Sequence, residues 1–298
     1  MMKNEKKKVA LLSVFAAIFL TGFKMIIGIL TGSLGILSEA LHSTLDLVAA
    51  VITFFSVSIS DKPADKEHNY GHGKIENFSA LIETLLLLIT CIWIVYEAVS
   101  RLASGNTHIE VNAWSYIVVI SAIVIDVTRS RALYKVAKKH NSQALEADAL
   151  HFSTDIWSSA VVLLGLICAN FGLYLADSVA ALLVAALVVF VSLKLGKKAI
   201  DVLLDTAPQN TIHLVEEKLL SMPEVKSYHD LKIRSAGANT FIKVNVHLEP
   251  DLSLMQVHEI CDKIERELNN LISRSEVSIH AEPEEENHIK TENMGVCK

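Results

Sequence analysis

The sequence predicts a bundle of six membrane-spanning helices followed by a small soluble α+β domain. Hydrophobic residues make up 51% of the 298-residue chain, and its mean hydropathy is +0.40. This apolar content is high for a soluble protein and low for a chain that lies in the membrane throughout. The apolar segments of membrane length all precede residue 205, after which polar and apolar residues alternate. Two parts of different character are therefore expected.

Six segments are long and apolar enough to cross a bilayer as a helix, which takes about 20 residues. They are Val9–Leu30, Leu34–Ser58, Phe78–Leu102, Ala113–Leu133, Ala147–Asn170 and Leu173–Leu195. Lysines cluster before the first span, between spans two and three, between spans four and five, and after the last span. By the positive-inside rule these segments, and with them both chain termini, are cytoplasmic.

The part after residue 205 predicts a small two-layer domain with the element order α-β-β-α-β, of the ferredoxin-like kind. The expected elements are Thr211–Ser221, Tyr228–Arg234, Thr240–Leu248, Leu254–Leu268 and Glu276–His280. We therefore expect a transmembrane domain over residues 1–204 and a cytoplasmic domain over 205–283. The tail, residues 284–298, is polar and expected to be disordered.

Two of the predicted spans carry the same pair of polar residues. His42 and Asp46 lie four residues apart in the second span, and His151 and Asp155 repeat this spacing in the fifth. Residues four apart are separated by about 40° around a helix, so each pair shares one face. If the two faces meet, they supply two imidazole nitrogens and two carboxylates, which suit a tetrahedral Zn²⁺ site.

Ordinary polar pairing inside a bundle is the competing interpretation, and the charges weigh against it. A charged residue at mid-bilayer costs about 2.5–3.5 kcal/mol even on the most lenient scale. The acids counted in the spans are Glu39, Asp46, Glu83, Glu97, Asp148 and Asp155. The basic residues available to them are Lys24 and Arg129. A bound cation would correct this imbalance.

The segments around the two pairs, SEALHSTLD and ADALHFSTD, resemble the paired signatures of the cation diffusion facilitator family. The loop segment PADKEHNYGHGKIE is similar as well, and the resemblance covers roughly residues 9–283. It implies a homodimeric transporter, not an enzyme, that exports Zn²⁺ or a related ion from the cytoplasm in exchange for protons. It also implies that His42, Asp46, His151 and Asp155 are the transport site. The sequence does not identify the membrane, and we expect it to be the cell membrane.

The loop after the second span carries a second candidate site. Asp65, His68 and His72 have a spacing that predicts one shared side of a helical turn. The resemblance implies that the matching positions form an additional metal site. The alternatives are a solvated loop with two histidines and an acidic surface that attracts cations toward the entrance.

The predicted cytoplasmic domain holds a third group of candidate ligands. They are His229, His247, His258, His280 and Glu282. Alternation along a strand places His280 and Glu282 on one face. The resemblance implies a metal-binding domain that stabilises the dimer, with Zn²⁺ as a structural or regulatory ion. Asn245 stands where some relatives have a ligand histidine, and His247 on the same face is a possible substitute, so the number of ions stays open.

The ligand types narrow the choice of metal. Two imidazoles argue against Mg²⁺ and Ca²⁺, which prefer oxygen ligands, and the absence of cysteine argues against Cu(I). Zn²⁺ fits best, while Fe²⁺, Co²⁺, Ni²⁺, Mn²⁺ and Cd²⁺ remain open alternatives.

Other classes of protein fit the sequence less well. A membrane metalloenzyme would need a general base and an open coordination position, yet the chain has no HExxH motif. A membrane-anchored metal sensor would leave the polar pairs of the spans unexplained. The net charge of −6 gives no sign of nucleic-acid binding, and no cofactor is expected beyond the metal itself.

Overall fold

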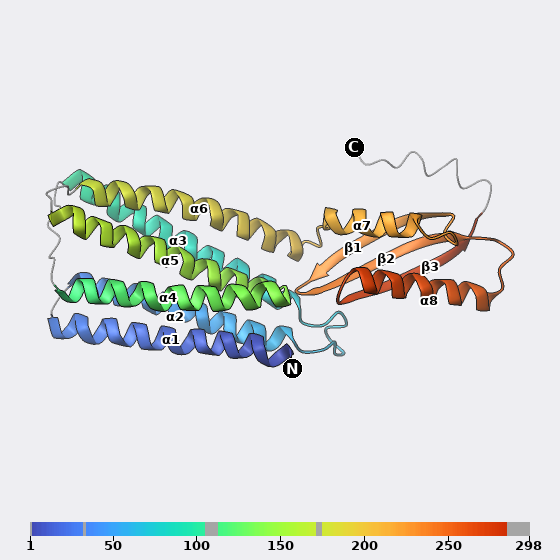
Figure 1. Cartoon of the computed structure of the whole chain (residues 1–298), viewed down its shortest axis with the longest axis horizontal. Helices are drawn as coiled ribbons and strands as arrows, with labels where there is room; N and C mark the ends of the chain where they lie inside the picture. The colour runs from blue at the N-terminus through green and yellow to red at the C-terminus, as the bar shows by residue number, and fades with distance from the viewer. Residues whose placement is uncertain (1, 32–33, 105–112, 171–174, 285–298) are drawn as a thin grey trace. The chain divides into compact units, whose positions relative to one another are not determined.

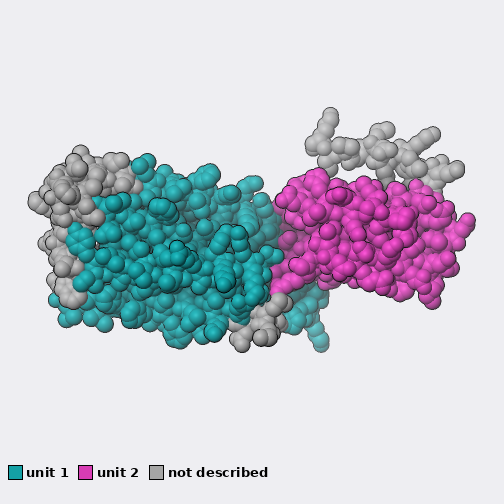
Figure 2. Space-filling view, viewed as in Figure 1, with its two compact units in different colours: residues 1–203 teal, residues 204–298 magenta. Residues whose placement is uncertain are grey.

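The computed structural model of the chain describes residues 2–31, 34–104, 113–170 and 175–284. The chain divides into two compact units, residues 1–203 and 204–298, which Figure 2 shows in teal and magenta. The tail that the sequence predicts to be disordered lies outside the described residues, except for Glu284.

The first unit consists of long helices that lie alongside one another (Figure 1). They are α1 (Met2–Thr31), α2 (Leu34–Ser60), α3 (Lys74–Ser104), α4 (Ala113–His140), α5 (Gln143–Asn170) and α6 (Leu175–Leu203). The most extensive packing is between α1 and α2, between α3 and α6, and between α4 and α5. Each predicted span overlaps one of these helices. Over the described residues, α1, α2 and α3 meet the length and apolar composition of a membrane span, so the prediction of six spans is only partly confirmed.

The helices of the first unit are longer than the predicted spans at their charged ends. Helix α3 begins at Lys74, before the expected start at Phe78, and α6 continues past Leu195 to Leu203. Hydropathy measures the apolar part of a helix, whereas lysine and glutamate are good helix formers and prolong it into water.

The distribution of side chains in the first unit is typical of a membrane-embedded bundle. Large apolar side chains such as Phe19, Trp93 and Phe190 point outward, with 62%, 69% and 67% of their surface exposed. Ionisable side chains such as Glu83 and Asp148 lie inside, with 0% exposed. Charged residues in membrane segments normally face the bundle interior, because lipid cannot solvate them.

A buried cluster centred on Glu76 ties four helices together near the start of α3. Lys6 of α1 contacts Glu76 Oε1 at 2.8 Å and Asp61 Oδ1 at 2.7 Å. Ser60 of α2 donates to Glu76 Oε1 at 2.8 Å, and Ser142, directly before α5, donates to Glu76 Oε2. Both Lys6 and Glu76 are almost fully buried, so each depends on the other for compensation of its charge.

The second unit follows the predicted order of elements. It comprises α7 (Gln209–Leu220), β1 (Ser227–Ala236), β2 (Asn239–Leu248), α8 (Leu254–Leu271) and β3 (Ser275–Pro283). Strand β2 lies in the middle of the sheet, antiparallel to β1 and parallel to β3. The core forms where Val215 and Leu219 of α7 and Ile264 and Leu268 of α8 pack against strand residues such as Val244.

We predict that Lys6→Met destabilises the first unit. Removal of one partner of a buried ion pair leaves the other charge uncompensated and costs about 3 kcal/mol. Thermal unfolding of the purified chain in detergent should show a lower midpoint for Lys6→Met than for the wild type. The matched control is Lys8→Met, because Lys8 is exposed on the same helix. Equal midpoints for the two variants would contradict this role of the cluster.

Candidate metal centre

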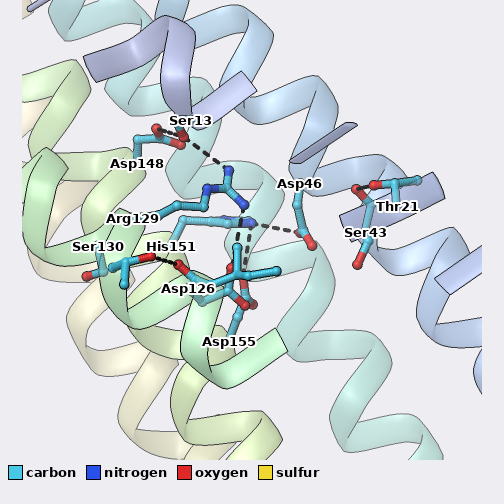
Figure 3. A network of polar contacts seen from close by, with 12 residues as sticks. Ser13, Thr21, Ser43, Asp46, Asp126, Arg129, Ser130, Asp148, His151 and Asp155 are labelled. Carbon is cyan, nitrogen blue, oxygen red and sulfur yellow. Dashed lines mark hydrogen bonds and ion pairs between the residues drawn. The ribbon is translucent and has the colours of Figure 1, made fainter. Parts of the chain in front are cut away.

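The two polar pairs predicted from the sequence meet where α2 and α5 pack against each other. His151 Nε2 lies 2.9 Å from Asp46 Oδ1 and 3.7 Å from Asp155 Oδ2. His42 Nε2 lies 3.8 Å from Asp155 Oδ1 and 3.9 Å from Asp46 Oδ1. Figure 3 shows Asp46, His151 and Asp155 pointing toward one another across the two helices. Each imidazole is thus near both carboxylates.

The geometry of this cluster suits a cation. His42, Asp46 and Asp155 each offer one ligand atom, and these atoms lie within 4.8 Å of one another. His151 joins them through its contact with Asp46. Asp46 and His151 are buried, and Asp155 Oδ2 makes no hydrogen bond. A buried carboxylate oxygen without a donor is costly, and a metal ion at this point would satisfy it.

Helix α4 adds two charged groups beside the cluster. Arg129 Nη1 lies 3.5 Å from Asp126 Oδ1, and Arg129 Nη2 donates to Ser13 Oγ of α1 at 3.0 Å. Ser13 in turn donates to Asp148 Oδ2 at 3.2 Å (Figure 3). The guanidinium lies 3.5 Å from the ring centre of Phe152. Arg129 therefore has a partner on its own helix and contacts on α1 and α5.

Asp126 corrects the count of acids made from the sequence, which omitted it. The acid lies within the predicted span Ala113–Leu133, three residues before Arg129. Groups three residues apart face the same side of a helix and commonly pair. The spacing of Asp126 and Arg129 is visible in the sequence. The negative charge of Asp126 offsets the positive charge of Arg129 in the interior of the bundle.

The loop between α2 and α3 brings its three candidate ligands together. Asp65 Oδ1 lies 3.3 Å from His68 Nδ1, and Asp65 Oδ2 lies 3.3 Å from His72 Nε2. The expected helical turn is wrong, because no helix forms here. Instead, Asp65 Oδ1 accepts the backbone N–H groups of Glu67 and His68, and Gly71 adopts a φ of +74°. An aspartate that binds its following backbone in this way forms a turn of its own.

The same hydrogen bonds affect the protonation of Asp65. Chiefly the backbone N–H of His68, and then that of Glu67, lower the pKa of Asp65 below its ordinary value. Donors to the charged form stabilise it. The carboxylate therefore stays ionised to a lower pH than a free aspartate, as a metal ligand must.

The sheet of the second unit assembles the third group. His229 Nδ1 of β1 lies 3.0 Å from His247 Nε2 of β2, and Glu282 Oε2 of β3 lies 3.9 Å from each imidazole. The register pairs His247 with Glu282, and an irregularity after His229 marks the β1–β2 pairing. Asn245 donates to His229 Nε2 and to Glu282 Oε1, both at 3.1 Å. Asn245 thus holds two candidate ligands in place.

Two of the predicted ligands of the second unit lie apart from this trio. His258 on α8 is 69% exposed in its side chain and lies 3.7 Å from Asp262. His280 is 66% exposed in its side chain, and its Nε2 lies 3.4 Å from Glu282 Oε1. The structure therefore gathers His229, His247 and Glu282, with His247 almost fully buried.

Known protein families match both units of the chain. The family model of the cation efflux transmembrane domain matches residues 10–204. The model of the cation efflux protein cytoplasmic domain matches residues 207–284. The chain belongs to the cation diffusion facilitator family. This cation diffusion facilitator is an integral membrane protein and a cation efflux transporter.

Individual relatives cover nearly the whole facilitator. An uncharacterized transporter of Methanocaldococcus jannaschii is 33% identical over 280 residues, which are 94% of this chain and 99% of that protein. The cation-efflux pump FieF of Yersinia enterocolitica is 31% identical over 256 residues, 85% of this chain and 84% of that pump. A solved structure of CzrB is 28% identical and covers 26% of this chain and 98% of that one, with a TM-score of 0.26. That score is too low to bear on the fold.

We predict that His247→Ala weakens zinc binding by the second unit of the full-length facilitator, whereas His258→Ala leaves it unchanged. His247 belongs to the buried trio, and His258 is an exposed histidine outside it. Asn245→Ala should weaken binding less, by about tenfold, because groups that orient ligands contribute on that scale. Isothermal titration with Zn²⁺ measures all three. Equal effects of His247→Ala and His258→Ala on the affinity for Zn²⁺ would show that His229, His247 and Glu282 do not form the metal site.

Proposed function

We propose that this cation diffusion facilitator exports Zn²⁺ from the cytoplasm in exchange for protons, through His42, Asp46, His151 and Asp155. The observation that carries the proposal is the convergence of two imidazoles and two carboxylates between α2 and α5. Two nitrogen and two oxygen ligands suit a four-coordinate zinc ion and disfavour Mg²⁺ and Ca²⁺. Four protein ligands also fill the coordination shell of a tetrahedral zinc ion. They leave no open position for a catalytic water molecule, which suits a transporter better than an enzyme.

The contact between His151 and Asp46 supports exchange with protons. His151 Nε2 lies 2.9 Å from Asp46 Oδ1, which is hydrogen-bonding distance. These two atoms can share a proton or bind a metal ion, but they cannot do both at once. Metal binding needs neutral imidazole and ionised carboxylate, so it releases protons, and histidine titrates near physiological pH. A site open to the more acidic side would gain protons and lose its metal.

The remaining parts of the proposal concern the assembly. Six spans with both termini in the cytoplasm follow from the lysine-rich connections, and the cell membrane is the proposed location. The match to the cytoplasmic dimerisation domain supports a homodimer. We assign this role to residues 205–283 and place one accessory zinc site at Asp65, His68 and His72. The second accessory site, of structural or regulatory zinc, comprises His229, His247 and Glu282.

We predict that His42→Ala and Asp155→Ala each abolish zinc transport into proteoliposomes, because each removes one of four ligands. The control is His213→Ala, which removes a histidine that is 76% exposed in the second unit. Size-exclusion chromatography should show the same assembly for all variants. Undiminished transport by both ligand variants would refute the assignment of the site.

The same vesicles test the counter-ion and the metal. An imposed pH gradient should change the rate of zinc transport by the wild type, and a rate independent of the gradient would refute proton exchange. Competition by Fe²⁺, Co²⁺, Ni²⁺, Mn²⁺ or Cd²⁺ measures selectivity. If one of these ions is transported in preference to Zn²⁺, the function as a metal transporter is supported, but the assignment of Zn²⁺ as its substrate is wrong.

A further inference from the structure

Glu83 on α3 is a buried acid that the transport site does not use. Its side chain has 0% of its surface exposed. Thr53 of α2 and Ser79 of α3 both donate hydrogen bonds to Oε1, the latter at 3.0 Å. The second oxygen, Oε2, is buried and has no hydrogen-bond partner. One half of this carboxyl group is thus satisfied and the other half is not.

Two charged groups of α5 act on Glu83. They are Asp148, which repels a negative charge on Glu83, and His151 of the transport site. Asp148 is itself fully buried, and its Oδ1 has no hydrogen-bond partner, while Oδ2 accepts from Ser13 (Figure 3).

Within the described residues, the hydrogen-bond partners of Glu83 are hydroxyl groups, and no ion pair joins it to a neighbouring helix. Helix α2 faces it with the hydroxyl of Thr53. On α6, over the residues whose side chains the structure describes, Ser192 is the buried polar group. No lysine or arginine pairs with Glu83 within the described part of the chain, in contrast to Glu76, which pairs with Lys6.

An acid in this position is more stable as a neutral acid than as an ion. Removal of a charge from water into a protein interior costs several kcal/mol unless a counter-charge is present. A second carboxylate close by disfavours ionisation further. A proton on Oε2 removes the charge, and with it the largest part of the cost of burying this group.

The position of Glu83 connects it to the transport site and to the charged end of α3. His151 and Asp148 lie three residues apart on α5, so a charge bound at His151 acts on Asp148 and on Glu83. Glu76, Ser79 and Glu83 follow one another at helical spacing on one face of α3, and Glu83 lies about 14 Å from the helix start at Lys74. This face provides polar groups along which a proton can leave.

We propose that Glu83 binds one of the protons that this transporter exchanges for its metal ion. The inference rests on the proposed proton exchange. The carboxyl group of Glu83 is protonated while the transport site holds no metal. A divalent cation at the site adds two positive charges near Asp148 and Glu83, and the O–H bond of Glu83 then breaks. The proton passes to cytoplasmic water, and the carboxylate that remains offsets one charge of the metal. Protonation of Glu83 accompanies release of the ion.

The test counts the protons that full-length transporter releases as it binds Zn²⁺ in weakly buffered solution with a pH indicator. Asp65→Ala and His229→Ala are included in every protein, so that the transport site is the one titrated. Glu83→Gln keeps the size of the side chain and an oxygen that accepts from Thr53 and Ser79. We expect this variant to bind Zn²⁺ and to release about one proton fewer for each ion.

The controls separate the possible failures. Glu259→Gln replaces an exposed acid of α8 and should leave the proton count unchanged. Thr53→Val retains the Glu83 carboxyl group but removes a donor to its charged form, so release of that proton should require a higher pH. This variant tests the proposal even if Glu83→Gln does not fold.

The outcomes are distinct. A wild type that releases no protons on binding Zn²⁺ would overturn proton exchange itself, and with it this proposal. A wild type that releases protons, with an equal count for Glu83→Gln, would overturn the role of Glu83 alone. If proton release on zinc binding has the same pH dependence in Thr53→Val as in the wild type, that result would also contradict the role of Glu83.

Discussion

The cost of charge in an apolar interior determines how the helices of this transporter are arranged around their polar residues. A carboxylate that leaves water needs a cation, hydrogen-bond donors or a proton. Glu76 meets this need with Lys6 and two serine hydroxyls, and these contacts join helices that are distant in sequence. Asp126 meets it with Arg129. The acids that lack such permanent partners are where an exchangeable cation can bind.

The proposed transport cycle follows from that difference. Asp46 and Asp155 face two histidines, which compensate their charge only while they carry protons. A divalent metal ion compensates both acids at once, and the two states exclude each other. The same reasoning applies to Glu83 and Asp148, since no salt bridge holds either acid within the described residues. Arg129 keeps a fixed positive charge nearby in both states through its contacts with Asp126 and Ser13.

Periodicity and composition predicted much of this structure. Apolar length located the helices, and alternation located the strands of the second unit in the correct order. The repeated spacing of His42 with Asp46 and of His151 with Asp155 placed each pair on one helix face, and the observed contact of α2 and α5 brings the faces together. A pattern that recurs in two separate segments is visible without knowledge of the packing.

Features that depend on tertiary contacts were less predictable. The spacing of Asp65, His68 and His72 suits a helix. Hydrogen bonds from the backbone to Asp65 instead form a different turn, which still brings the three side chains together. In the second unit, strand register and the irregularity of β1 decide that His247 joins His229, while α8 leaves His258 exposed. The pairing of Asp126 with Arg129 can be read from their spacing, but the packing of their helix against α5 cannot.

The proposed transport site consists of two histidines and two aspartates of α2 and α5 that bind one metal ion. Zinc K-edge X-ray absorption of the transporter tests it directly, with the loop and second-unit sites removed by Asp65→Ala and His229→Ala. We expect four nitrogen and oxygen ligands at about 2.0–2.2 Å, with the scattering pattern of two imidazole rings. A shell of six oxygens without imidazole, or one that contains sulfur, would contradict it.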